Sequence, residues 1–306
     1  GYAALYSFEA GSDGDGHNTV IGSNASFHLD SGTKNTMVGY AAGQGSSGTI
    51  TYTGNTGVGY NALYSITTGH SNSALGSGSL ALNTTGVNNT AIGRMALSKI
   101  NDTSHNTALG SQAGSSCIGS ENVFIGWDAA NKATGANNNV IIGSNAGSTA
   151  TNDLTTGDNN TLVGADCRVT TGDAQNQIVI GQGAVSQGSN FAVIGNSSIT
   201  RVYIADDGAG VLYANGTIQS SDRRLKENID DSDLGLEFVN KLRPVRYTYI
   251  DDRQDGKTKY GIIAQEVQEV LEETNNKDFA GIKDDNPDKL GADYNQFIAP
   301  LMKAVQ

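Results

Sequence analysis

The stretch Asn18-Thr-Val-Ile-Gly-Ser-Asn-Ala25 decides the fold of this chain, because its pattern recurs along the first two thirds of the sequence. The unit is Asn-x-x-[Val/Ile/Leu]-Gly-x-x-small, seen again in Asn89-Thr-Ala-Ile-Gly-Arg-Met-Ala96. Eleven copies occur, and their glycines are spaced by 14 to 21 residues, most often 17. The repeat glycines are Gly22, Gly39, Gly59, Gly76, Gly93, Gly110, Gly126, Gly143, Gly164, Gly181 and Gly195. Such a period indicates a repeat architecture.

Each repeat supplies one aliphatic residue before its glycine and one small residue three positions after it. This pairing suits a narrow solenoid, in which stacked coils bury one another's apolar side chains. The aliphatic residues expected to be buried include Ile21, Val58, Ile92 and Ile142. The Asn that opens each coil is placed to bond the backbone or to stack as a ladder, with Gln177 and Phe191 as the two exceptions.

Eleven coils stacked at the spacing of β-strands, about 4.8 Å, form a rod roughly 50 Å long. A coil of this size encloses little apolar area, and open strand edges invite pairing. We therefore predict a mainly β, parallel β-solenoid or β-roll that associates into a bundle, followed by a small α+β domain.

Composition changes abruptly near residue 220, which indicates that the chain contains two regions with different folds. Residues 1–219 hold 35 of the 40 glycines, whereas residues 220–306 hold all three prolines and most of the charge. We expect a repeat solenoid over residues 1–208, a transition strand over residues 209–219 and the α+β domain over residues 220–306. The chain starts without a methionine, so we expect further sequence upstream of Gly1.

A net charge of −12 without a basic stripe argues against nucleic acid as a partner, because that affinity comes mainly from Lys and Arg. No apolar run approaches the roughly 18 residues that cross a bilayer, and no signal peptide is visible, so no membrane contact is expected. The two cysteines, Cys117 and Cys167, lie outside any CxxC pair or His cluster and are interpreted as small buried residues. We expect no cofactor and no metal ion.

Three other features could carry chemistry. The four histidines are interpreted as exposed link residues, namely His17, His28, His70 and His105. The acidic stretch from Gly11 to Gly16 resembles a calcium loop, but it occurs once and lacks a closing Glu. A group of aromatic residues forms either a sugar-binding surface or, as we favour, a cover on the solenoid: Tyr2, Tyr40, Tyr60, Tyr64 and Trp127.

From Ser220 onward, the apolar spacing becomes that of mixed helix and strand. The expected elements are a helix ending before Pro244, strands from Val245 to Ile250 and from Tyr260 to Ile263, and helices from Ala264 to Glu273 and from Tyr294 to Gln306. Ser232 is placed to cap the first helix. Pro300 should kink or restart the last one.

The repeat resembles the head repeats of trimeric autotransporter adhesins of the YadA kind (Asn-Ser-Val-Ala-Ile-Gly-x-x-Ala) and similar repeats in phage tail fibres. Three later motifs resemble the peptidase S74 intramolecular chaperone: Ser220-Ser-Asp-Arg-Arg-Leu-Lys-Glu-Asn-Ile229, Leu242-Arg-Pro-Val-Arg-Tyr247 and Tyr260-Gly-Ile-Ile-Ala-Gln-Glu-Val267. In that family the module follows endosialidases, tail spikes and tail fibres, trimerises, guides folding of the fibre and then cuts itself away. The family module usually continues into a longer helix, so the resemblance also implies that the domain is truncated at Gln306.

This resemblance implies a catalytic Ser/Lys dyad, with Ser221 as the nucleophile, Lys226 of the same or a neighbouring chain as the general base, and cleavage between Ser220 and Ser221. A Ser hydroxyl is a poor nucleophile until a base removes its proton, and Lys is a base only in its neutral form. Arg223 and Arg224 lie close enough in sequence to help Lys226 stay neutral.

We therefore expect a structural component of a trimeric phage tail fibre, located in the virion and assembled in the host cytoplasm. Its expected partners are two further copies of itself, other tail proteins, and a glycan or protein receptor on the host cell. Beyond self-cleavage, no enzymatic turnover is expected. Two alternatives stay open. A tail spike with an upstream polysaccharide depolymerase would turn over polysaccharide, and a bacterial trimeric surface adhesin would need a C-terminal membrane anchor.

Overall fold

The computed structural model describes residues 1–7, 16–46, 48–149, 152–202, 221–248, 258–283 and 290–306. The chain divides into two compact units, Gly1–Val202 and Tyr203–Gln306. The predicted transition strand, the domain boundaries at residues 208 and 219, and most of the calcium-like loop fall outside the described residues. They stay predictions.

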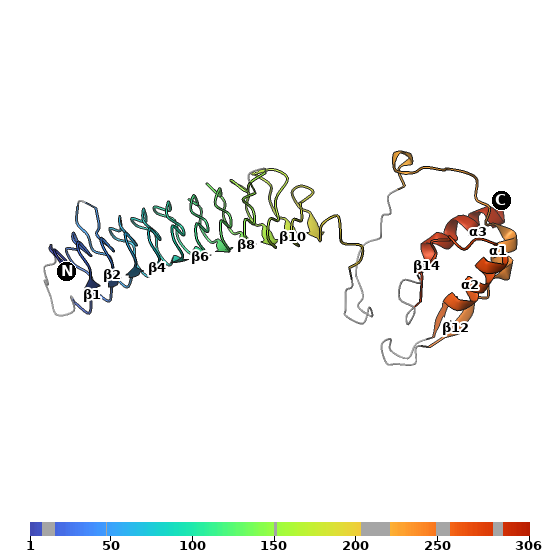
Figure 1. Ribbon diagram of the computed structural model, residues 1–306, viewed down its shortest axis with the longest axis horizontal. Helices are drawn as coiled ribbons and strands as arrows, with labels where there is room; N and C mark the ends of the chain where they lie inside the picture. The colour runs from blue at the N-terminus through green and yellow to red at the C-terminus, as the bar shows by residue number, and fades with distance from the viewer. Residues whose placement is uncertain (8–15, 47, 150–151, 203–220, 249–257, 284–289) are drawn as a thin grey trace. The chain divides into compact units, whose positions relative to one another are not determined.

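Residues 19–194 form a parallel β-solenoid in which each coil adds one three-residue strand to a single sheet (Figure 1). The strands are β1 Thr19–Ile21, β2 Thr36–Val38, β3 Thr56–Val58, β4 Ser73–Leu75, β5 Thr90–Ile92, β6 Thr107–Leu109, β7 Val123–Ile125, β8 Val140–Ile142, β9 Thr161–Val163, β10 Ile178–Ile180 and β11 Ala192–Ile194. Strands pair in chain order, and equivalent repeat positions stand opposite each other, as Ile92 and Leu109 do. The predicted parallel solenoid is confirmed.

The middle residue of each strand faces the solenoid interior, and its two neighbours face outward, because successive strand residues point to opposite sides. In β5, Ala91 is fully buried while Ile92 is 38% exposed, and Ile21 in β1 is 59% exposed. The expectation that the aliphatic residue before each glycine fills the interior is therefore wrong for the single chain. Val58 and Ile142 are half-buried.

The small residue three positions after the glycine does lie inside in every copy except the last, where Ser198 is exposed, and it leaves room for larger neighbours. Ala96 and Cys167 at this position are fully buried. Volume is also shared between coils, since Met37 occupies the space above Gly57, where an added Cβ would lie 2.7 Å from the Met37 sulfur. The interior is thus filled by complementary sizes rather than by one repeated side chain.

The Asn at the start of each coil is buried and forms a hydrogen-bonded ladder. Asn89 donates through Nδ2 to Asn72 Oδ1 at 3.1 Å and to the Thr103 carbonyl at 2.9 Å. Its own Oδ1 accepts from the backbone N and the Nδ2 of Asn106. The same pattern links Asn18 to Asn160 rung by rung. Each asparagine of this ladder therefore has hydrogen-bond partners for its amide, which confirms the ladder interpretation.

The C-terminal unit is a small α+β fold, as predicted. Its elements are the 3₁₀ turn η1 Arg223–Leu225, α1 Leu236–Lys241, β12 Val245–Tyr247, β13 Lys259–Gly261, α2 Ala264–Glu273, β14 Ile282–Lys283, β15 Gly291–Ala292, η3 Tyr294–Phe297 and α3 Ile298–Val305. The strand pairs β12–β13 and β14–β15 are antiparallel. Its core comprises Leu234, Phe238, Val267, Leu271 and Phe297.

Of two local expectations in this unit, one is wrong and the other is confirmed. Ser232 does not cap the first helix, because α1 starts after Gly235 and the Ser232 hydroxyl donates instead to the Leu234 carbonyl at 3.0 Å. Of the two effects expected of Pro300, the restart of the last helix is confirmed. Pro300 lies in the first turn of α3, which restarts at Ile298 after η3, and its missing N–H costs little in a first turn.

Candidate functional site

Ser221 and Lys226 lie within hydrogen-bond distance of each other in a single chain. The Lys226 ammonium nitrogen Nζ is 2.9 Å from the Ser221 hydroxyl, and both residues are exposed. Among the described residues, the Lys226 side chain makes its hydrogen bond to Ser221. A nucleophile and its base are recognised by such contact. The structure therefore brings together the two residues that the sequence singled out, while Ser220 lies outside the described residues.

The turn between the two residues accounts for their contact. Asp222 caps η1, and its carboxylate accepts from the backbone N–H of Arg224 at 2.9 Å. The turn closes where the Lys226 N–H donates to the Arg223 carbonyl at 3.2 Å. A capped turn of this length reverses the chain once, so residues five apart in sequence can meet.

Arg224 is engaged with Asp222 rather than with the dyad. Its Nη2 lies 2.5 Å from the Asp222 carboxylate, and its Nε donates to both carboxylate oxygens. The Arg224 side chain and backbone N–H hold the pKa of the Asp222 carboxyl below its usual range. Because the Asp222 carboxylate balances the charge of Arg224, the positive field of Arg224 at Lys226 is weaker than the sequence alone suggested. Of the two arginines, Arg223 is the one that is exposed and not paired with Asp222.

An ion pair that sequence reasoning missed joins the second and third motifs. Arg243, just before β12, forms a two-pronged contact with Glu266 on α2, in which Nε donates to Oε2 at 2.9 Å. The contact lowers the pKa of Glu266 and raises that of Arg243. Tyr294 adds a further link, because its hydroxyl accepts from the Ile262 N–H at 3.1 Å. Both residues stand in the quoted motifs, but they are 23 residues apart, so their pairing could not be predicted from the sequence.

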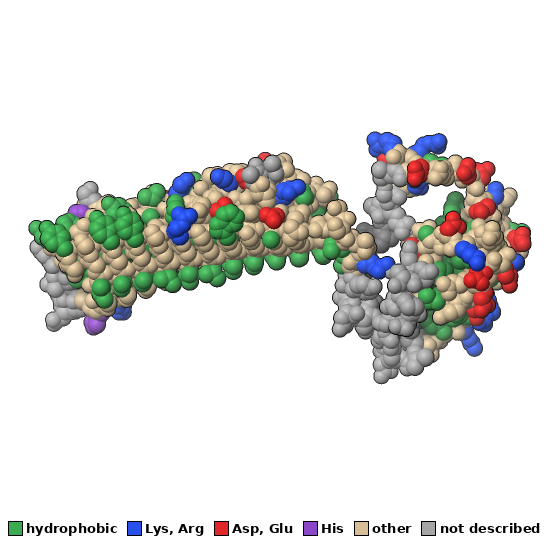
Figure 2. All heavy atoms as spheres, viewed as in Figure 1, with side chains coloured by type: hydrophobic (Ala, Val, Ile, Leu, Met, Phe, Trp, Pro, Cys, Tyr) green, Lys and Arg blue, Asp and Glu red, His purple; other side chains and the backbone are tan. Residues whose placement is uncertain are grey.

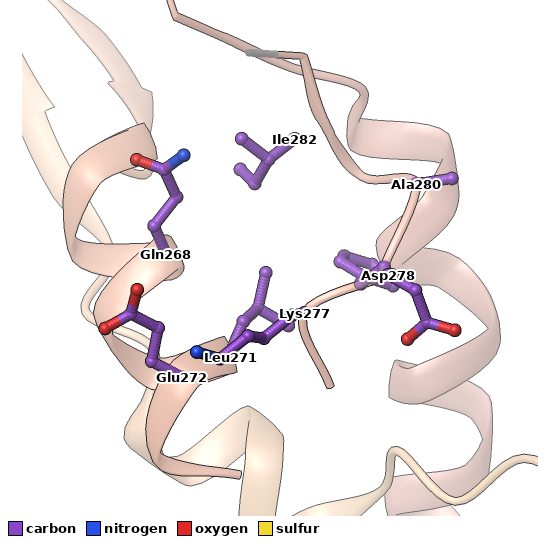
Figure 3. A pocket seen from close by; sticks show the side chains of 8 residues that line it. Gln268, Leu271, Glu272, Lys277, Asp278, Ala280 and Ile282 are labelled. Atoms are coloured by element: carbon purple, nitrogen blue, oxygen red, sulfur yellow. The ribbon is translucent and has the colours of Figure 1, made fainter. Parts of the chain in front are cut away.

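A hollow of about 280 Å³ is lined by Arg243 and Glu266, and two further hollows occur among the described residues of the C-terminal unit. One of about 470 Å³ lies between α2 and the segment that follows it, with Gln268, Leu271 and Glu272 on the helix and Asp278 and Ala280 opposite (Figure 3). The other, of about 200 Å³, is apolar and is lined by residues of α1, η3 and α3, including Phe238, Leu242, Phe297, Pro300 and Leu301. No Ser, Cys or His lies among the described residues that line these two hollows, so neither offers such a nucleophile.

The other sequence candidates are the histidines, the calcium-like loop and the exposed aromatic residues. Three of the histidines are exposed and His28 is half-buried. Within the described ranges, no group of three or more His, Cys, Asp or Glu could hold a metal ion. The aromatic residues Tyr2, Tyr40, Tyr60, Tyr64 and Trp127 are exposed. Tyr40 and Tyr60 stack on each other with centroids 5.3 Å apart, so part of each ring face is already occupied.

The described part of the chain contains no helix that is both long and apolar enough to cross a membrane. Residues 221–275 match the Peptidase_S74 family, the chaperone of endosialidase. No curated protein matches the chain. The matched residues include the dyad, α1, β12, β13 and α2. The protein thus joins a parallel β-solenoid body to a peptidase S74 chaperone domain, a domain typical of trimeric fibre and tail-spike proteins.

Proposed function

We propose that this chain is a structural part of a trimeric phage tail fibre whose C-terminal domain drives trimerisation and folding and then releases itself. The observation that carries the proposal is the 2.9 Å contact between Ser221 and Lys226 inside the region matched to the S74 chaperone. The solenoid supports the structural part, since a long repetitive rod suits a fibre and a chaperone suits a β-rich chain that folds slowly.

The proposed cleavage proceeds in two steps. Lys226, in its neutral form, takes the proton of the Ser221 hydroxyl as Oγ attacks the Ser220 carbonyl carbon. The Ser220–Ser221 C–N bond breaks, the amine of Ser221 receives that proton, and an ester remains. Water then hydrolyses the ester, so residues 1–220 end in a carboxylate and residues 221–306 leave as the chaperone. The contact within one chain favours Lys226 as base toward its own Ser221.

Assembly is the proposed trigger for cleavage. Both dyad side chains are exposed in the single chain, and water around an amine favours its charged form. Packing of three chains around the dyad would exclude that water and favour the neutral base. In the proposed setting the trimer belongs to the virion, is assembled in the host cytoplasm, contacts other tail proteins and engages a glycan or protein receptor.

The test compares the wild type with Ser221→Ala, Lys226→Ala and Lys226→Arg, each expressed as the full chain and analysed by intact mass. The wild type should yield fragments that end at Ser220 and begin at Ser221. All three variants should slow cleavage at least about 100-fold. Lys226→Arg keeps the positive charge but cannot act as a base, because a guanidinium does not lose its proton.

The control is Lys241→Ala, which removes an exposed lysine that pairs with Glu273 rather than with the dyad. It should cleave like the wild type. An intact wild-type trimer, or normal cleavage by Ser221→Ala or Lys226→Arg, would show that the assignment is wrong. Cleavage by a monomeric wild type would contradict the assembly trigger alone.

A further inference from the structure

The outward side of the solenoid sheet carries a continuous column of aliphatic side chains, one from each strand. This aliphatic column consists of Ile21, Val38, Val58, Leu75, Ile92, Leu109, Ile125, Ile142, Val163, Ile180 and Ile194. Its members are half-buried or exposed, with Ile21 at 59%, Leu75 at 51% and Ile194 at 58% exposed. Figure 2 shows hydrophobic side chains in an unbroken row along the edge of the solenoid that bears the strands. Single apolar residues on a surface are ordinary, but a column of this length is not.

The column stays straight although the coils differ in length. The step from Ile142 to Val163 spans 21 residues and the step from Leu109 to Ile125 spans 16, yet each pair stands in register across neighbouring strands. The extra residues therefore fall in the links and not in the strands. With strands about 4.8 Å apart, eleven rungs give a column about 50 Å long.

The rest of this sheet face is also free of charge. The second outward column consists of Thr19, Thr36, Thr56, Ser73, Thr90, Thr107, Val123, Val140, Thr161, Ile178 and Ala192. Neither column contains Lys, Arg, Asp, Glu or His. A sheet face or edge in contact with water is normally protected by charged side chains, Lys above all. A face of 22 positions without a single charge has the composition of a covered surface.

We propose that this sheet face is the contact between three parallel copies of the chain, with the aliphatic columns packed side by side along the threefold axis. The inference rests on the proposed function, which supplies the trimer, and it adds the surface that builds it. In a closed symmetric arrangement, each rung meets the same rung of the other copies. Leu75 of one chain thus contacts Leu75 of its neighbours.

A second copy is the occupant that fits this surface. A partner must offer an equally long and straight apolar column with no charge to pair, and this chain itself carries one. The orientation follows from the second column, which changes from Thr and Ser in β1–β6 mainly to Val, Ile and Ala in β7–β11. Parallel chains in register match polar rungs with polar rungs and apolar rungs with apolar rungs, which an antiparallel pair would not.

Cross-linking of matched cysteine variants tests the contact directly. Leu75 in the column and Leu82 in a link between strands are both leucines and are 51% and 50% exposed. Full-length Leu75→Cys, treated with a short bis-maleimide, should give linked chains on a denaturing gel, and Leu82→Cys should not. The native Cys117 and Cys167 are buried, so the unmodified protein serves as the background. Equal linking of the two variants would overturn the proposal.

Charge insertion provides the second measurement. Leu75→Lys with Leu109→Lys places two charges in the column, whereas Leu82→Lys with Ile118→Lys places them at residues that are 50% and 56% exposed elsewhere. The column variant should lower the trimer fraction in light scattering at least tenfold, and the control should stay trimeric. If the column variant loses its β-sheet circular dichroism, the cysteine result decides.

The outcomes separate this inference from the function on which it rests. If the wild type trimerises and cleaves but the column variant also trimerises, the proposed contact surface is wrong and the proposed function is unaffected. If the folded wild type is monomeric, both the proposed contact surface and the proposed trimeric function are wrong.

Discussion

At the scale of single residues, Gln177 interrupts the asparagine ladder. Its backbone N–H reaches Asn160 Oδ1 at 3.1 Å, but its buried Nε2 and Oε1 have no hydrogen-bond partner among the described residues. The extra methylene carries the amide past the position that Asn occupies in the other coils. Unpaired buried amide atoms lower stability, since water no longer satisfies them.

Gln177→Asn should therefore stabilise the solenoid by about 1 kcal/mol. This corresponds to a rise of roughly 2–4 °C in the melting temperature for a unit of this size. Gln187→Asn, at an exposed position of the same region, makes the same chemical change and should leave the melting temperature unaltered. Thermal denaturation followed by circular dichroism checks both, and an unchanged Gln177→Asn would contradict the ladder argument.

The buried thiols predict how stability depends on pH. Burial raises the pKa of Cys117 and of Cys167 to about 11, from an ordinary value of 9.0. Below pH 9 the thiols are neutral in both states, so their full contribution is present. As pH rises from 9 to 11, the unfolded chain ionises first and folding stability falls. Burial raises the pKa of Tyr52 above its ordinary value of 10.0 as well, which lowers stability in the same direction from about pH 10 upward.

The melting temperature should accordingly fall as the pH is raised from 9 to 11, and a variant with Ala at both cysteine positions should fall less steeply. The native thiols should also resist Ellman's reagent at pH 8 and react after unfolding in guanidinium. Rapid reaction of the folded protein would mean that these side chains are accessible.

At the scale of the strand and its following turn, the repeat glycine sets the distance between coils. Gly93 has φ +135°, and an added Cβ would lie 2.3 Å from the Gly110 carbonyl oxygen. Gly188 has a similar φ of +130°, but an added Cβ there would meet only the Phe191 ring at 3.6 Å. The two positions share the conformational cost of a side chain and differ in the steric contact.

Gly93→Ala should thus destabilise the solenoid by about 1–3 kcal/mol more than Gly188→Ala, because only the first pushes neighbouring coils apart. Denaturant unfolding of the two variants beside the wild type measures the difference. Equal losses would mean that the backbone conformation, and not the close approach of coils, accounts for the repeated glycine.

At the scale of the whole molecule, the proposed trimer should be kinetically stable once the chaperone has left. Unfolding must break contacts along a rod of eleven coils in three chains, so the barrier is high whatever the equilibrium. The cleaved shaft should run as a trimer on a denaturing gel without heating and as a monomer after boiling. Monomer bands from unheated, cleaved protein would count against it. Uncleaved Ser221→Ala protein offers the comparison with the chaperone still attached.

The sequence by itself determined that this part of the chain is a parallel solenoid, predicted over residues 1–208 and found with its strands over residues 19–194, because Asn, an aliphatic residue and Gly recur at fixed positions from coil to coil. It also located the α+β domain and singled out Ser221 and Lys226 through their motif. The bounds of α2 were predicted to the residue, since its apolar spacing is regular. The helix start at Ser232 was wrong, because a cap depends on where the preceding chain turns.

Only the tertiary structure decided which side of each strand faces inward. The residue repeated most faithfully, the aliphatic one before each glycine, lies outside, while the interior position varies from Gly57 to Phe124. Interior side chains share volume between neighbouring coils, so one can shrink where the next grows. The outward aliphatic column has no such freedom to vary in size, because in the proposed trimer each of its side chains must fit the same side chain of the other copies. A regular repeat in the sequence shows that the residue type at a position is restricted. The direction of the Cβ in the structure shows whether packing in the chain's own core or contact at its surface imposes that restriction.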